Sequence, residues 1–264
     1  MSDTSQSSEG RGVQSIEVGT QLLEALIARG EPMMLKELAA SLGIAPAQAH
    51  PYLVSFRNMG MVEKNESSGR YQLGPFALDL ALSRMRSADP MQLVSKVAEA
   101  LSQRTGLTTL VSVWGAFGPT VVVVNEGKDQ LHMNTRVGTV YSVTGTATGR
   151  VFASYMPAEV SRQTIRSGLQ RSLQDRYVGT AQSFGDTDMA EIRAHGVGSV
   201  PMPPVPGINA IAAPVFDHLG QVMAVLTMVG DARVLDSSPD TALAETLGDA
   251  AQQLSSELGY LPVA

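Results

Sequence analysis

The chain has 264 residues, of which 44% are hydrophobic and 17% charged, with a formal net charge of -6 and no cysteine. This length and hydrophobic content suffice for one small and one medium globular domain, each with its own core. The lack of cysteine excludes disulfides and thiolate chemistry, and the negative charge excludes coating of nucleic acid through bulk electrostatics. No apolar run reaches the length of a membrane span, so we expect a cytoplasmic protein without a membrane partner.

The amino-terminal segments differ sharply in character. Residues 1–12, MSDTSQSSEGRG, are polar and rich in serine and glycine, which predicts a disordered arm. Apolar residues then recur at helical spacing and predict an amphipathic helix from 13 to 29. Its inward face is expected to consist of Ile16, Leu23, Leu26 and Ile27.

Residues 35–74 predict two short helices joined by a tight turn and followed by a two-stranded wing. Gly43 supplies the permissive backbone of the turn, and Pro46 suits the first turn of the second helix. Short strands at 61–64 and 71–73 flank a turn. Together with the first helix, this segment predicts a winged helix-turn-helix domain over 13–74, which places one helix in a DNA groove. The alternative is a purely structural helix pair with a hairpin in an α+β domain.

The predicted winged domain has a near balance of acidic and basic side chains, so any DNA contact must be local. Gln48 has the donor and acceptor that pair with adenine, while Arg57 and Arg70 suit phosphates. The full set of expected DNA contacts is Lys36, Ala47, Gln48, His50, Pro51, Arg57 and Arg70.

The rest of the chain predicts a linker helix over 75–89 and an α/β domain over 90–264. A helix is expected at 91–104. Strand-like segments then follow and predict an antiparallel meander at 110–114, 120–124 and 131–143. Further helices are expected at 145–155, 157–167, 187–195 and 239–258, and further strands at 208–216 and 221–229. The fold class is therefore α+β.

Catalytic and metal-binding patterns are absent from the sequence. Residues 145–149 have the glycine spacing of a nucleophile elbow, but Ala147 stands where serine is required. The four histidines are scattered without metal-ligand spacing, and no phosphate-binding glycine motif is present. We therefore expect no enzymatic activity, no metal and no cofactor.

Four segments together resemble IclR-type transcriptional regulators: GRYQLG at 69–74, ATGRVFA at 147–153, GINAIAAPVFD at 207–217 and GQV at 220–222. The resemblance extends over 13–260. It implies an amino-terminal winged helix that binds operator DNA and a carboxy-terminal GAF-like domain that binds a small organic effector. It also implies homodimers, often paired into homotetramers.

By this resemblance, the floor of the effector pocket is expected at Ala147, Thr148, Asn209, Ala210, Thr227 and Val229. Thr148 would lie at a helix amino terminus, where unpaired N–H groups and the helix dipole favour a carboxylate. Ordinary core packing is the alternative for each of these residues.

The chain departs from IclR-type relatives at 199–206, SVPMPPVP, where many of them have an acidic stretch. Prolines stiffen this loop, and Val200 is one of its apolar side chains. Loss of carboxylates removes repulsion toward an anion, so we expect an organic acid with an apolar or aromatic body. Additional contacts are expected from Trp114, with Phe117, Met133, Arg136 and Tyr141 as further candidates.

A second departure is Pro51, because the family commonly carries arginine directly after His50. Proline removes a cationic contact and, inside a helix, an intrahelical hydrogen bond, at a cost of about 3 kcal/mol. We expect the helix to kink or to begin near Pro51, or the DNA reader to be impaired. The leading hypothesis is an effector-controlled regulator; the alternative is a sensor or interaction module with a degenerate, weakly DNA-binding winged helix.

Overall fold

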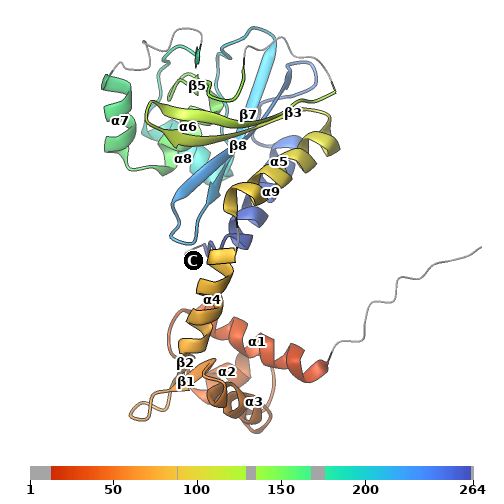
Figure 1. The fold of residues 1–264 in the computed structure, drawn as a ribbon, viewed down its shortest axis with the longest axis vertical. Helices are drawn as coiled ribbons and strands as arrows, with labels where there is room; N and C mark the ends of the chain where they lie inside the picture. The colour runs from red at the N-terminus through yellow and green to blue at the C-terminus, as the bar shows by residue number, and fades with distance from the viewer. Residues whose placement is uncertain (1–12, 88, 129–134, 168–175, 263–264) are drawn as a thin grey trace, which may run out of the picture. The chain divides into compact units, whose positions relative to one another are not determined.

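The computed structural model describes residues 13–87, 89–128, 135–167 and 176–262. The chain divides into two compact units, Met1–Ala88 and Asp89–Ala264 (Figure 1). The expected disordered arm, residues 1–12, lies outside the described residues.

The amino-terminal unit contains helices and a two-stranded wing in the predicted order. Its elements are α1 (Gln14–Arg29), α2 (Leu35–Ser41), α3 (Pro46–Asn58), β1 (Val62–Lys64), β2 (Tyr71–Leu73) and α4 (Pro75–Ser87). The wing strands are antiparallel, with Val62 opposite Leu73. An isolated bridge between Met33 and Tyr71 attaches the segment before α2 to the wing. The winged helix-turn-helix arrangement is thus confirmed.

The inward face of α1 differs from the predicted one. Ile16 and Ile27 are 66% and 43% exposed, whereas Gly19, Leu22 and Leu26 are buried. A side chain at position 19 would meet the Phe56 ring of α3, since a Cβ at that position would lie 2.9 Å from the Cζ of the ring. Because the Phe56 ring packs against Gly19, the buried face of α1 includes this glycine. The pattern of hydrophobic residues alone does not indicate this.

Helix α3 runs unbroken through Pro51, so the expected late helix start is wrong. Pro46 occupies the first turn, and the backbone N–H of Ala45 donates to Gln48 Oε1 at 3.0 Å, which caps the helix. Ala49 and Leu53 are fully buried and hold the helix against the core. Pro51 is exposed, so its ring is accommodated in solvent while packing on the other side maintains the helix.

The carboxy-terminal unit is a six-stranded sheet covered by helices on both faces (Figure 1). Its elements are α5 (Pro90–Thr105), β3 (Thr108–Gly115), β4 (Gly118–Asn125), β5 (Val140–Tyr141), α6 (Ala147–Tyr155), α7 (Ala158–Ser167), β6 (Tyr177–Val178), α8 (Asp186–His195), β7 (Ile208–Phe216), β8 (Val222–Asp231) and α9 (Ala242–Glu257). The strand order is β6-β5-β4-β3-β8-β7, and only the β5–β6 pair is parallel.

Alternation along β7 divides the core of this unit into layers. Ile211 and Ala213 pack with α5 and α9, whereas Ala212 packs with α6 and α8 on the opposite face. This is the period-two pattern of a strand that is covered on both sides. The mixed α+β fold class is thus confirmed.

The predicted strand at 131–143 is largely wrong. Residues 129–134 lie outside the described part, and only Val140–Tyr141 of the remainder is strand. Residues before it form a turn in which the N–H of Arg136 donates to Thr139 Oγ1 at 3.0 Å and Gly138 has a φ of 88°. Strand β6 was not predicted, because two residues paired with a distant strand carry no local pattern. Among the described residues, no helix has the length and apolarity needed to cross a membrane.

Candidate functional site

The first candidate site is the exposed face of α3. Ala47, Gln48, His50, Pro51 and Arg57 are all exposed there. Lys36 of α2 is exposed as well, and Arg70 at the start of the wing strand is partly buried. All the residues that were predicted to contact DNA therefore belong to the winged unit and reach its surface.

Several polar groups on this surface are already engaged. The Gln48 carboxamide oxygen caps α3, so it is not available to adenine while that hydrogen bond persists. Arg70 Nη1 donates to Pro32 O at 2.9 Å and lies 3.2 Å from Glu37 Oε2, while Arg57 Nη2 lies 3.6 Å from Glu66 Oε1.

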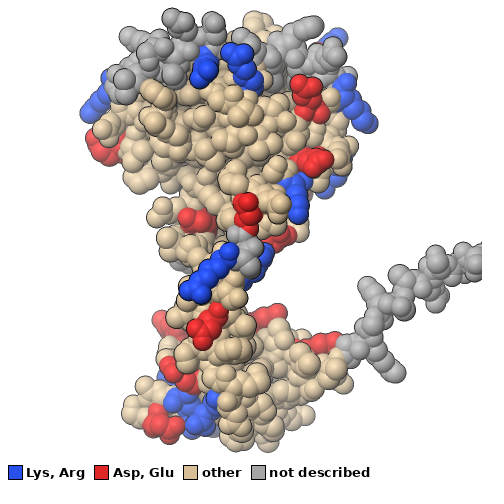
Figure 2. Space-filling view, viewed as in Figure 1, with Lys and Arg blue, Asp and Glu red and all other residues tan. Residues whose placement is uncertain are grey.

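These pairs produce a surface of mixed charge. On the side of the winged unit seen in Figure 2, acidic and basic side chains lie next to one another near the wing. A hydrogen bond from the Met34 backbone N–H, with further help from Arg70, lowers the pKa of Glu37, so this carboxylate is ionised at neutral pH. DNA binding therefore has to compete with internal pairs for both arginines.

The second candidate site is a small cavity of about 50 Å³ enclosed by the start of α6, strands β7 and β8, and the proline-rich loop at 199–206. Residues predicted to hold an effector meet at its wall: Ala147, Thr148, Val200, Ala210, Thr227 and Val229. Pro203, Pro204 and Val205 close it from the loop side. The tertiary structure thus brings together segments that are far apart in the sequence.

Other predicted effector residues lie elsewhere. Trp114 packs edge-on against Phe152, with ring centroids 5.6 Å apart, and the Asn209 side-chain amide donates to Leu235 O at 2.9 Å. Phe117 and Arg136 are not in the cavity wall, and Met133 lies outside the described residues. For Asn209 the reason is strand alternation, since its neighbour Ala210 points to the cavity face.

The cavity wall is apolar apart from a few hydroxyl groups. Thr148 Oγ1 and Thr227 Oγ1 are 2.8 Å apart, and each residue is 1% exposed. Tyr141 Oη is 3.1 Å from Thr135 Oγ1. Burial raises the pKa of Tyr141 to about 12, so its phenol stays protonated at neutral pH. Thr135 was not anticipated, because a residue outside regular structure gives no sequence signal that it lines a cavity.

The start of α6 turns tightly beside this cavity. A side chain at Gly149 would collide with the backbone carbonyl of Ser142, and one at Gly145 with that of Thr180. Thr146 caps the helix by accepting from the Gly149 N–H at 3.0 Å. These contacts explain the glycine spacing of this motif by close backbone packing rather than by nucleophilic chemistry.

Helix α6 also presents unpaired donors at its first turn. The backbone N–H groups of Ala147 and Thr148 have no hydrogen-bond partner among the described residues. Both residues line the cavity, so the positive end of the helix dipole acts on it. An anion bound here would meet N–H donors and the threonine hydroxyls, with no acidic side chain in the described wall to repel it.

An outer recess of about 630 Å³ adjoins the small cavity, because Pro203 and Pro204 line both. The Gln182 side chain bridges the recess by donating to Met202 O at 2.7 Å. Buried Arg150 supports the recess wall from behind, with Nε 2.8 Å from Thr144 O and Nη2 2.9 Å from Ser183 O. The proline-rich loop therefore separates a deep pocket from a larger vestibule.

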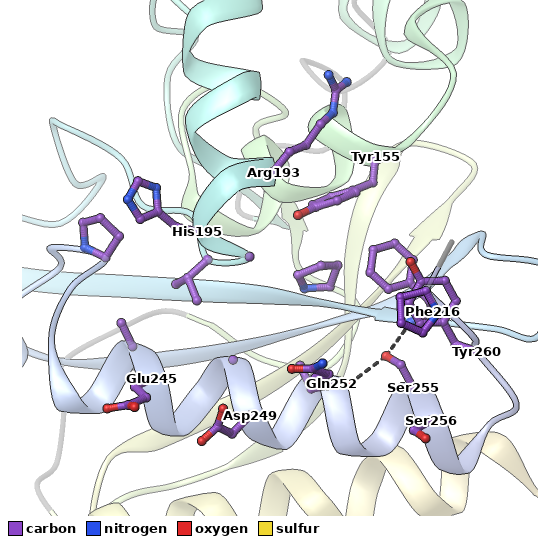
Figure 3. Close-up of a pocket in the computed structure, with 18 of the residues that line it drawn as sticks. Tyr155, Arg193, His195, Phe216, Glu245, Asp249, Gln252, Ser255, Ser256 and Tyr260 are labelled. Carbon is purple, nitrogen blue, oxygen red and sulfur yellow. Dashed lines mark hydrogen bonds between the residues drawn. The ribbon is translucent and has the colours of Figure 1, made fainter. Parts of the chain in front are cut away.

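A third hollow, of about 720 Å³, lies between α8, the edge strand β7 and α9 (Figure 3). Tyr155, Phe216 and Tyr260 cluster at one end, with ring centroids of successive pairs 5.1 and 4.7 Å apart. His195 and Glu245 lie toward the other end. This hollow was not anticipated from the sequence. Among the described residues, no group of acidic or histidine side chains is arranged to hold a metal ion.

Comparison with known proteins agrees with both units. Residues 15–66 match the IclR helix-turn-helix domain, and residues 83–256 match the family described as bacterial transcriptional regulator IclR C-terminal. The glycerol operon regulatory protein of Streptomyces griseus is 27% identical over 251 residues, covering 94% of this chain and 98% of the relative.

Solved structures give the same result. The crystal structure of Pseudomonas aeruginosa HmgR is similar with a TM-score of 0.79 and 30% identity, covering 94% of this chain and 99% of that one. That of the Agobacterium tumefaciens repressor BlcR has a TM-score of 0.72 and 19% identity, covering 95% and 99%. The relatives found are named as regulators of transcription and not as enzymes. The chain belongs to the IclR family of transcriptional regulators.

Proposed function

We propose that this regulator binds operator DNA through its winged unit and is controlled by a small organic acid that binds in the cavity at the start of α6. The observation that carries the proposal is the combination, in one apolar wall, of free first-turn N–H groups with the buried hydroxyl pair of Thr148 and Thr227. Such fixed donors among apolar walls orient a ligand and select its charge.

The volume of the cavity adds a requirement. About 50 Å³ is less than the few hundred Å³ typical of ligand pockets, so an acid with an apolar body must displace part of the wall. The loop at 199–206 is the element to move, because its Pro203 and Pro204 line both the cavity and the outer recess. Ligand binding and loop displacement are therefore coupled in this proposal.

Neutral polyols are the competing ligand class, because one relative is named a glycerol operon regulatory protein. A thermal-shift screen of aromatic and aliphatic carboxylates against polyols and neutral metabolites discriminates between the classes. We expect carboxylates to raise the melting temperature. Val205→Glu, which adds a carboxylate at the loop side of the cavity, should abolish that shift, whereas Ser256→Ala in the third hollow should preserve it. Stabilisation by polyols alone would refute the assignment.

We also propose that the protein works as a homodimer or homotetramer. Helix α4 exposes Phe76, Leu78, Leu80, Leu82 and Met85, each by 38% to 60%. An exposed helix with so many apolar side chains is expected to be covered by another subunit. Sedimentation analysis should show no monomer at micromolar concentration, and Leu78→Glu should produce one.

The alternative function is a small-molecule sensor or interaction module with a degenerate winged unit. The internal engagement of Gln48, Arg57 and Arg70 favours it. A gel-shift assay with the DNA upstream of the protein's own gene separates the two functions. Sequence-specific retardation supports the regulator, and failure to exceed the affinity for unrelated DNA supports the module.

A further inference from the structure

The exposed side of α3 carries an apolar line between Ala47 and Val54. Successive residues of a helix are rotated by about 100°, so the buried side chains of Ala49 and Leu53 define its inward direction. The residues directly opposite follow the spacing i, i+4, i+7 and occupy one line along the exposed side. They are Ala47, Pro51 and Val54, named here the apolar ridge, and the exposed Asn58 continues the same line at the end of α3.

The ridge offers no hydrogen-bonding side-chain group. Val54 is 39% exposed, although a valine in a helix of this size is more often buried. Two polar residues beside the apolar ridge, Gln48 and Ser55, form hydrogen bonds with backbone groups of α3 and its N-cap. Ser55 Oγ donates to Pro51 O at 3.1 Å, and Gln48 Oε1 accepts from the Ala45 N–H and caps the helix. Between Ala47 and Val54 this line therefore has only methyl and methylene groups to present, and Asn58 adds a carboxamide at its end.

This pattern limits what the helix can read. In the major groove, thymine is the base that presents a methyl group, whereas guanine, adenine and cytosine present only hydrogen-bonding groups beside their ring edges. An apolar side chain against those polar groups would leave them without partners after water is displaced. The arginine that commonly reads guanine is also missing from the ridge, and Arg57 on its flank is paired with Glu66.

We propose that α3 selects its DNA site through the 5-methyl groups of thymines, which pack against the apolar ridge. The proposal rests on the proposed binding of operator DNA and adds the chemical basis of sequence choice. Phosphate contacts by Lys36 and by displaced arginines would supply affinity, while the ridge supplies specificity. His50, which is exposed beside the ridge, is left for a hydrogen bond at its edge.

The test begins with selection of bound duplexes from a random library by the full-length protein at fixed salt. Each thymine of the selected site is then replaced by uracil, which removes the methyl group and keeps base pairing. We expect a loss of affinity of about three- to fivefold at each thymine under the ridge, which is the cost of one buried methyl group. Replacing cytosine by 5-methylcytosine elsewhere in the site should have no effect.

A matched pair of variants assigns the effect to the ridge. Val54→Ala shortens the ridge at an exposed position and should abolish the uracil penalty at one thymine. Met59→Ala, which removes a side chain that is 53% exposed just beyond the end of α3, should leave every penalty intact. Sequence-specific binding that tolerates uracil at every position would overturn the thymine-methyl proposal while operator binding stands. Equal effects of the two variants would do the same. Failure to select any sequence overturns the proposed function together with it.

Discussion

The buried hydroxyl pair of Thr148 and Thr227 provides a quantitative test of the cavity wall. Replacing either threonine by valine keeps the shape of the side chain and removes one partner of the 2.8 Å hydrogen bond. The remaining hydroxyl is then buried without a partner, since both residues are only 1% exposed. Replacing both threonines removes the polar pair as a unit.

The magnitude follows from this burial. An orphaned buried hydroxyl costs about 1 to 3 kcal/mol, whereas removal of both partners with conservation of shape is nearly neutral. Each single variant should therefore lower the free energy of unfolding by about 1 to 2 kcal/mol, and the double variant by less than the larger single effect. The coupling free energy should be at least about 1 kcal/mol. Thr187→Val on α8 is the control, because that threonine is exposed.

Urea unfolding followed by tryptophan fluorescence measures these changes in the free energy of unfolding for the carboxy-terminal unit. The chain has a single tryptophan, and Trp114 packs against Phe152 of α6 within the sheet unit. Its emission therefore reports the unfolding of the domain that contains the cavity. Neutral single variants with strictly additive effects would refute the hydrogen bond and, with it, the polar floor of the proposed effector site.

The tight turn before α6, the buried phenol and Pro51 each support a further prediction. Gly149→Ala should destabilise the sheet unit by several kcal/mol, about 3 or more, because its Cβ collides with the Ser142 carbonyl; an unchanged urea midpoint would contradict the tight turn. Because burial raises the pKa of Tyr141, the protonated phenol stabilises the fold below pH 10, and this stability is lost as pH rises toward about 12. Absorbance titration should therefore show the Tyr141 phenolate forming only together with alkaline unfolding. Tyr141→Phe should remove this part of the absorbance change. Pro51→Arg should tighten DNA binding at least about tenfold at moderate salt and steepen its salt dependence, since the added phosphate contact outweighs the loss of one thymine-methyl contact; gel shifts showing weaker binding would exclude an impaired reader.

Local patterns in the sequence determined most of the elements and the order of the domains. Apolar spacing, glycine turns and proline positions each act over a few residues, so helices such as α5 and strands such as β7 could be predicted within a few residues of their ends. The resemblance of four ordered motifs then identified the family. It also selected Thr148 and Thr227, which a pattern confined to one segment could not have connected.

Tertiary structure alone decided which of these residues face a site. Ile16 is exposed because Phe56 packs on Gly19 of α1, and Asn209 bonds Leu235 O because strand alternation turns Ala210 to the cavity. Whether Gln48 is free to read a base depended on the cap of its own helix. The orientation of Ile16 and Asn209 is set by contacts between distant segments, and the engagement of Gln48 by competition for its carboxamide oxygen. Neither effect produces a periodic pattern in the sequence.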